Sequence, residues 1–233
     1  MTDTSVAFHG FEKPLLRFLK ELDKHNDRDW FHENKARYEG YVREPALAFI
    51  RAFRAELGKI SPYFVASDRR VGGSLMRVYR DTRFGKDKTP YKTNVGIHFR
   101  HELCGDVHAP GFYVHIEPRG CFLGAGIWHP DPKSLKKIRA AIDEKPKLWT
   151  KARDDKKFRA TFELAGDSLK TAPRDYAKDH PMIEDLRRKD FIAVRNLTEA
   201  DVIKPCFLQA VGNAFRSSSP FVRFLCDAIG VPF

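Results

Sequence analysis

The stretch that decides the fold is residues 93–100, TNVGIHFR, with the two segments that follow it, 112–117, FYVHIE, and 121–128, CFLGAGIW. In the first two segments apolar and polar residues alternate, which is the pattern of a strand with one buried face. Pro118, Arg119 and Gly120 form a turn between the second segment and the third. We therefore expect an antiparallel sheet that is covered by helices on one face and partly polar on the other.

Residues 74–80 and 191–197 have strand-like composition and extend the predicted sheet to four or more strands. Apolar residues at helical spacing lie on both sides of this region. We expect helices at 14–24, at 34–57 with a kink at Pro45, at 134–143, 146–153 and 156–164, and one or two within 205–229, with a break at 26–31. The sequence thus predicts an α+β fold, with a sheet from roughly residues 74–128 and 191–197 covered by N- and C-terminal helices.

The composition, with 42% hydrophobic and 31% charged residues in 233, is that of a folded globular protein. No repeat or flexible linker is present, so we expect a single domain over residues 1–233. No segment approaches the roughly 20 apolar residues of a membrane span, and the N-terminus lacks a signal pattern, so we expect a soluble, cytoplasmic protein without a membrane partner. The four cysteines, Cys104, Cys121, Cys206 and Cys226, include no Cys-x-x-Cys pair, which argues against a zinc ribbon or a disulfide framework.

Positive charge is concentrated in the middle third of the chain. The formal net charge is +11, and residues 69–100 contain nine Lys or Arg against two Asp. Between residues 133 and 195 basic residues alternate with acidic ones, as on solvated helix faces. The middle third is therefore the region in which we expect a site for an anionic partner.

Residues 77–92, RVYRDTRFGKDKTPYK, are the densest polar motif of the chain. This motif resembles the signature of the bacterial conserved hypothetical family called domain of unknown function 2461, and the resemblance extends to 8–11, 26–31, 124–128 and 180–181. It implies that the signature positions are Arg77, Arg80, Asp81, Arg83, Phe84, Asp87, Lys88 and Tyr91. Because the family has no assigned activity, the resemblance implies no reaction.

The motif contains the side chains of an anion site. Guanidinium groups, a lysine and a tyrosine hydroxyl hold phosphate or carboxylate through charge-assisted hydrogen bonds. The candidate anion-binding residues are Arg77, Arg80, Arg83, Lys88 and Tyr91. In a regular strand Arg77 and Asp81 share one face and Arg80 lies on the other, so the three arginines meet one ligand only across a bulge or turn.

The alternative is structural: Asp81 and Asp87 pair with the arginines and fasten the loop to the sheet, with Phe84 and Tyr91 as packing anchors. Six basic residues face only these two acids between residues 77 and 92. Pairing therefore leaves excess positive charge for solvent or a ligand.

The polar face of the predicted sheet is the second candidate site. Alternation places Asn94, His98 and Arg100 on one strand and Tyr113, His115 and Glu117 on the next. His115 with Glu117 is the candidate for proton transfer, and Asp81 would position an arginine, so these three are the candidate catalytic residues. The alternative for His98, His115 and Glu117 is a divalent metal site, which the absence of metal-ligand spacing disfavours, so no metal site is expected; the sequence identifies no cofactor.

Several other features receive structural interpretations. His129 and His180 lie in turns and are interpreted as hydrogen-bonded caps. Gly124 and Gly126 lie in an apolar strand-like run, which favours a bulge or close backbone packing over a nucleotide-binding loop.

Three functions remain open from the sequence. The first is a protein that binds a phosphate or carboxylate in a cleft between the Arg77–Lys92 loop and the polar face of the sheet, in one version an enzyme on a small anionic substrate. The second is a nucleic-acid-binding module that stacks bases on Tyr79, Phe84 and Tyr91. The third is a scaffold whose signature is an internal salt-bridge network and whose partner is another protein.

Overall fold

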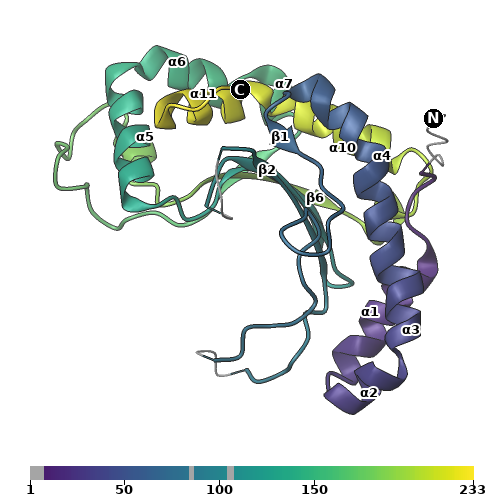
Figure 1. The fold of residues 1–233 in the computed structure, drawn as a ribbon. Helices are drawn as coiled ribbons and strands as arrows, with labels where there is room; N and C mark the ends of the chain where they lie inside the picture. The colour runs from purple at the N-terminus through teal and green to yellow at the C-terminus, as the bar shows by residue number, and fades with distance from the viewer. Residues whose placement is uncertain (1–7, 84–86, 104–107) are drawn as a thin grey trace.

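The computed structural model describes residues 8–83, 87–103 and 108–233. Its sheet has six antiparallel strands in the order β1-β2-β3-β4-β6-β5. Figure 1 shows this sheet nearly edge-on. The strands are β1 Phe64–Val65, β2 Val95–His101, β3 Gly111–Ile116, β4 Cys121–Ile127, β5 Glu163–Ala165 and β6 Phe191–Leu197. The predicted α+β fold with an antiparallel sheet is confirmed, and β2, β3, β4 and β6 lie where their sequence patterns placed them.

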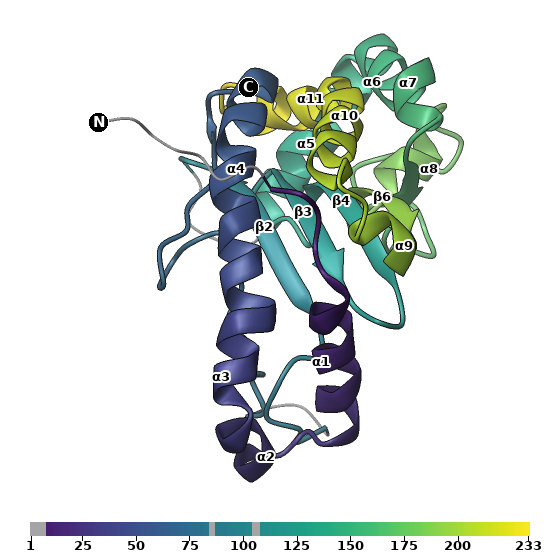
Figure 2. The same ribbon diagram turned by 90° about the vertical axis from the view of Figure 1, so that its right-hand side faces the viewer.

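The helices lie before and after the central strands in the chain. They are α1 Lys13–Lys24, α2 Arg28–Glu33, α3 Lys35–Tyr38, a π-helical segment Glu39–Arg43, α4 Glu44–Ile60, α5 Pro132–Glu144, α6 Pro146–Arg153, α7 Lys156–Arg159, α8 Ile183–Leu186, α9 Glu199–Val202, α10 Phe207–Ser217 and α11 Ser219–Ile229. Figure 2 shows α1, α4 and α10 on one side of β2 and β3. The strand side chains that point toward these helices form the core.

Phenylalanine dominates this core. Phe99 of β2 stacks on Phe53 of α4 with ring centroids 5.0 Å apart, and Phe112 of β3 contacts Phe215 of α10 at 4.9 Å. All four rings are fully buried. Each such side chain contributes about 1.5–3 kcal/mol through burial, which fastens the helices to one face of the sheet.

Strand pairing determines which polar side chains are neighbours on the other face. His98 lies opposite Tyr113, and Gly96 lies opposite His115, in the β2–β3 register. A side chain at Gly96 would clash with the Tyr113 hydroxyl, since its Cβ would lie 2.6 Å from that oxygen. The glycine therefore makes room for the tyrosine ring on the polar face.

The structure corrects three of the predicted elements. Residues 74–80 form no continuous strand. The first part of this segment hydrogen-bonds to β2, where Leu75 bridges Ile97, and the last part hydrogen-bonds to residues 90–92, where Tyr79 bridges Tyr91. The helix predicted at 156–164 ends at Arg159, because β5 pairs with β6. The break predicted at 26–31 contains the start of α2, which Asp27 caps by accepting a hydrogen bond from the Trp30 amide.

The predicted interruption at Pro45 is present as the π-helical segment that precedes α4. None of the helices in the described ranges is long and apolar enough to cross a membrane.

Candidate functional site

Residues 77–83 and 87–92 form the two arms of an extended hairpin, which we call the signature hairpin. Its two arms are joined by backbone hydrogen bonds from the Arg80 amide to the Pro90 carbonyl and from the Lys92 amide to the Val78 carbonyl. Figure 1 shows it projecting away from the sheet beside α1 and α2. Phe84 lies outside the described residues, so its roles in packing and stacking stay predictions.

Two arginines of the hairpin are paired with its two acids. Arg80 pairs with Asp87, and Arg83 holds Asp81 with two hydrogen bonds of 3.0 and 2.7 Å. The hydrogen bonds from Arg83 hold the pKa of Asp81 well below its usual range. Both pairs lie within the hairpin and neither reaches the sheet, so they brace the hairpin itself.

The remaining candidate anion-binding residues have different surroundings. Lys88 donates to the Thr82 carbonyl at 2.8 Å. Arg77 is exposed and has no ion pair with any residue the structure describes. Burial, together with the nearby Arg77 and Arg80 charges, lowers the pKa of Lys92. Positive charge at the base of the hairpin is therefore only partly compensated.

Helix α2 is fixed against the hairpin at Tyr91. Asn26, just before α2, accepts from the Tyr91 amide at 3.0 Å and donates to its carbonyl at 2.9 Å. The Tyr91 ring stacks on Phe31 with ring centroids 4.0 Å apart. These contacts join two segments that are 65 residues apart in the chain.

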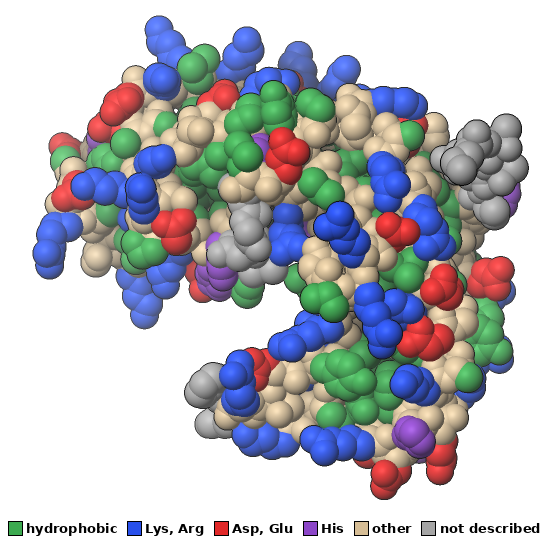
Figure 3. Space-filling view, viewed as in Figure 1, with side chains coloured by type: hydrophobic (Ala, Val, Ile, Leu, Met, Phe, Trp, Pro, Cys, Tyr) green, Lys and Arg blue, Asp and Glu red, His purple; other side chains and the backbone are tan. Residues whose placement is uncertain are grey.

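Between α2 and the hairpin lies a hollow of about 490 Å³, which we call the α2–hairpin cleft. Its lining residues are Arg28, Asp29, Phe31, His32, Lys35, Tyr79, Arg80, Thr82, Pro90 and Tyr91. Figure 3 shows, below a broad hollow in the molecule, a hydrophobic patch bordered by Lys and Arg side chains on the lobe that contains α2 and the hairpin. Of the predicted anion-binding residues, Arg80 and Tyr91 line the cleft, whereas Arg77, Arg83 and Lys88 do not.

Three basic residues of the cleft were missed in the sequence. Arg28, His32 and Lys35 are spaced by four and three positions, and all three line the cleft from α2 and the start of α3. All three are exposed, and none of their side chains has a hydrogen bond or ion pair with another described residue. Their helical spacing could have identified them as neighbours in the sequence. We predicted a break at 26–31 instead of a helix, so this spacing was not recognised.

The candidate proton-transfer residues are connected on the polar face. The Tyr113 hydroxyl lies 3.1 Å from Nδ1 of His115, and Nε2 of His115 lies 3.2 Å from Glu117. Glu117 also accepts from Thr93 at 2.9 Å. Burial and then Glu117 raise the pKa of Tyr113 to about 12, so the phenol keeps its proton and is able to donate a hydrogen bond to Nδ1 of His115. Asp81 belongs to the hairpin and has no contact with this network among the interactions described.

His98 lies on the same face and is mostly buried. Burial, and to a lesser extent the Arg100 charge, lowers its pKa from 6.5 to about 4. Between pH 6.5 and 4 the unfolded chain thus binds a proton that the folded protein does not, so stability falls as the pH is lowered through this window.

We expect His98→Gln to remove this part of the pH dependence. At 1.36 kcal/mol per pKa unit, and allowing for partial solvent screening, the effect is on the order of 2 kcal/mol. Urea unfolding of both proteins at pH 7 and pH 4 measures it. Equal losses of stability in the two proteins would contradict the assignment.

Within the described ranges, no group of three or more His, Cys, Asp or Glu is arranged to hold a metal ion. Cys121 and Cys206 are free thiols, and Cys104 lies outside the described residues.

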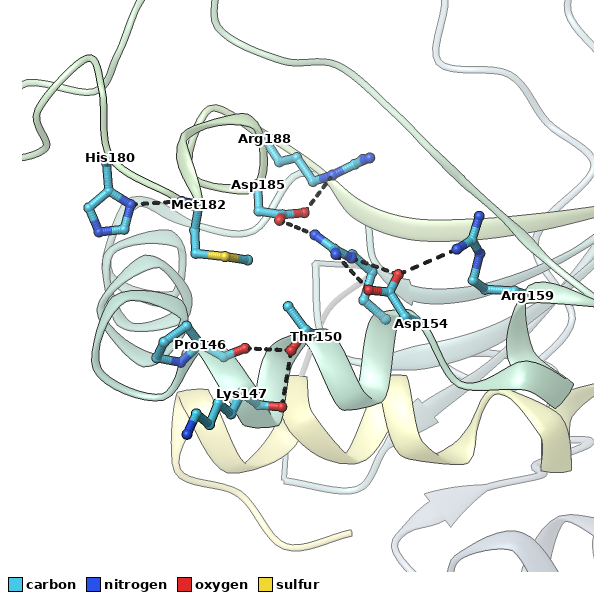
Figure 4. Close-up of polar contacts among 10 residues, drawn as sticks. Pro146, Lys147, Thr150, Asp154, Arg159, His180, Met182, Asp185 and Arg188 are labelled. Atoms are coloured by element: carbon cyan, nitrogen blue, oxygen red, sulfur yellow. Dashed lines mark hydrogen bonds and ion pairs between the residues drawn. The ribbon is translucent and has the colours of Figure 1, made fainter.

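A second charged network lies at the opposite end of the fold, between α6 and α8 (Figure 4). Arg153 pairs with both Asp154 and Asp185, and its bond to Asp154 is 2.6 Å long. Arg159 and Arg188 extend the network at 3.9 Å from these carboxylates. Asp185 is buried, so this network ties α6 to the segment before β6 and contributes to stability.

The chain thus combines a helix-backed antiparallel sheet with a basic hairpin held against a short helix. The family model described as conserved hypothetical protein (DUF2461) matches residues 14–224, and the chain belongs to this family. No curated protein and no solved structure matched in the corresponding comparisons. The resemblance expected from the signature is therefore confirmed.

Proposed function

We propose that the protein binds a small anionic ligand, with a phosphate or carboxylate group, in the α2–hairpin cleft. The observation behind this proposal is the lining of the cleft: Arg28, Lys35 and Arg80 are cations, and Asp29 is its only acid among the described lining residues. Arginine and lysine side chains that converge on one hollow bind anions through charge-assisted hydrogen bonds.

The walls of the cleft support a ligand larger than an inorganic ion. Tyr79 is 54% exposed, and its ring lies 5.5 Å from that of Tyr91. Tyr91 is itself packed on Phe31. An exposed aromatic ring on a fixed base suits the apolar part of an organic phosphate or carboxylate.

The other predicted anion-binding residues take supporting roles in this proposal. Arg77 adds to the positive potential at the base of the hairpin, and Lys88 and Arg83 hold the outer part of the hairpin in place. Asp81 positions Arg83 through its two hydrogen bonds.

The enzymatic version of the proposal uses His115 and Glu117 for proton transfer on the polar face. Their 3.2 Å contact supports it, since a carboxylate orients an imidazole in this way. A substrate hydroxyl would replace the Tyr113 hydroxyl at Nδ1 of His115.

Removing the cleft cations tests the binding proposal. We expect Arg28→Ala combined with Lys35→Ala to weaken binding of inorganic phosphate or phenyl phosphate at least about tenfold, because each charged hydrogen bond contributes about 1.5–3 kcal/mol. Isothermal titration calorimetry at low salt measures the dissociation constants.

The matched control combines Lys13→Ala with Arg17→Ala, which removes the same charge from exposed positions of α1 outside the cleft. The control should bind like the unchanged protein. Absence of binding to either ligand, or equal weakening in both variants, would contradict the proposal.

Nucleic acid is the alternative partner for the same charges. A single-stranded oligonucleotide should then bind with an affinity that falls steeply between 50 and 200 mM salt. Only Tyr79 of the two described stacking candidates is exposed, since Tyr91 is buried, which favours a small ligand. Tighter binding of the oligonucleotide than of phenyl phosphate would favour the alternative.

A further inference from the structure

One histidine outside the proposed anion site differs from the other histidines of the chain. In three of them both ring nitrogens have hydrogen-bond partners: His101, His115 and His180. His108 contacts the Trp128 carbonyl. Four others have no carboxylate partner in the described chain: His9, His25, His32 and His98. His129 alone has one nitrogen on a buried carboxylate and the other without a partner among the described residues.

The carboxylate is that of Asp190, whose side chain is only 2% exposed. It accepts from the His129 amide and from the Asp167 amide, both at 2.8 Å, and its Oδ1 lies 2.9 Å from Nδ1 of His129. Gly166 has a φ of +95°, and a Cβ there would lie 2.4 Å from Asp190, so a glycine is needed for this close approach. A proton on Nδ1 of the neutral ring would face this carboxylate, and Nε2 has no partner among the described residues.

The backbone at His129 has an unusual conformation. Its φ of +46° is the only positive value at a non-glycine residue in the described chain. Left-handed backbone at a non-glycine residue costs roughly 1–3 kcal/mol and is concentrated at functional sites. Asparagine is enriched in this conformation as histidine is, so a purely structural cap at this position does not require an imidazole.

A flat apolar surface lies beside the open nitrogen. Trp128 is 50% exposed, and its ring centroid is 4.2 Å from that of His129. The ring of His108 stacks on Trp128, with the ring centroids 6.0 Å apart. An exposed indole offers a stacking surface to an aromatic ring of a ligand.

We propose that His129 is a general base in a second, hydrolytic site, held by Asp190 as a positioning residue, and that this site takes carboxylic esters with an aromatic group. Nε2 of His129 removes a proton from water, and the water oxygen forms a bond to the ester carbonyl carbon. The bond from this carbon to the leaving oxygen breaks, and the proton on Nε2 passes to that oxygen. The products are the acid and the alcohol or phenol, and no other reactant is needed.

The probe is 4-nitrophenyl acetate, whose hydrolysis releases a coloured phenolate. We expect saturable hydrolysis, and we expect His129→Asn to lower kcat/KM by about 100-fold, in the range of general base catalysis. Asparagine can keep the bond to Asp190 and the left-handed backbone but has no basic nitrogen. Trp128→Ala should raise KM with little change in kcat, and Asp190→Asn should lower kcat with little change in KM.

Two control variants separate this site from ordinary reactive histidines. His180→Asn removes another Asp-paired imidazole, with Asp143 at 3.0 Å, and His9→Asn removes an exposed one. Both should keep the full rate. A wild-type rate that does not saturate, or equal rates in wild type and His129→Asn, would overturn the proposal.

A second measurement applies if the His129 variant does not fold. In the ¹⁵N NMR spectrum of the unchanged protein above pH 8, His129 should have a protonated Nδ1 and an unprotonated Nε2. The opposite tautomer would overturn the proposal.

Discussion

Replacing Gly126 by alanine is expected to lower the free energy of unfolding by about 4 kcal/mol, the sum of backbone strain and steric overlap. Gly126 has a φ of +120°, and an added Cβ would lie 2.0 Å from the Phe191 carbonyl oxygen and 3.0 Å from Phe221. The carbonyl belongs to β6, which pairs with β4 at this point, so the overlap is relieved only if the two strands separate.

Gly120→Ala is the matched control for this substitution. Gly120 lies in the exposed turn before β4, and no atom lies within 4 Å of its added Cβ. Its replacement should change stability by less than about 0.5 kcal/mol. Urea unfolding of the two variants provides the comparison, and equal stability would refute the close packing of β4 on β6.

Replacing Asp185 by alanine should have the second-largest effect, a loss of about 3 kcal/mol. Removing one partner of a buried ion pair costs about 3–5 kcal/mol. Arg153 still pairs with Asp154 in the variant, so we expect a loss at the lower end of this range. The Asp185 side chain is 8% exposed, so no water replaces the lost carboxylate at Arg153. Arg188, whose pKa burial lowers and Asp185 raises, also loses its counterion.

Glu184→Ala provides the comparison at the neighbouring position. Glu184 is 80% exposed and pairs with Arg187 on the same turn, an arrangement that contributes about 0.5 kcal/mol or less. Thermal and urea unfolding should therefore separate the two alanine variants clearly. If both lose the same small amount, the network of Figure 4 does not stabilise the fold.

The strands of the sheet could be predicted because their pattern is local. Alternation over six or seven residues was enough to locate β2 and β3, strand-like composition located β6, and Pro146 marked the start of α6. The short elements could not be found in the same way. β5 has three residues and is a strand because β6 lies beside it, a fact that its own sequence does not contain.

The candidate site was predictable only in part, because a site depends on long-range contacts. The charge excess of residues 77–92 was visible in the sequence. The cleft, however, forms where α2 lies against the hairpin, and this contact depends on Asn26, which lies 65 residues from its partner Tyr91. Likewise His129 lies 61 residues from Asp190. Its interpretation as a hydrogen-bonded cap is correct for the contact but omits the open Nε2.

The pairing of arginines with acids was anticipated as an alternative, and its geometry is now defined. Arg80 with Asp87 and Arg83 with Asp81 account for both acids of the hairpin. Arg28 of α2 and Lys35 of α3 then become the main groups for an external anion, with Arg80 in the lining of the same cleft.

The most direct test of the anion-binding proposal is a crystal of the protein soaked in selenate, measured at the selenium absorption edge. Selenate has the shape and charge of sulfate, and its anomalous signal identifies its position without bias from the protein model. We predict a selenium peak in the α2–hairpin cleft, within hydrogen-bond distance of Arg28, Lys35 or Arg80. An empty cleft beside selenate peaks on other basic surfaces of the same crystal would contradict the proposal.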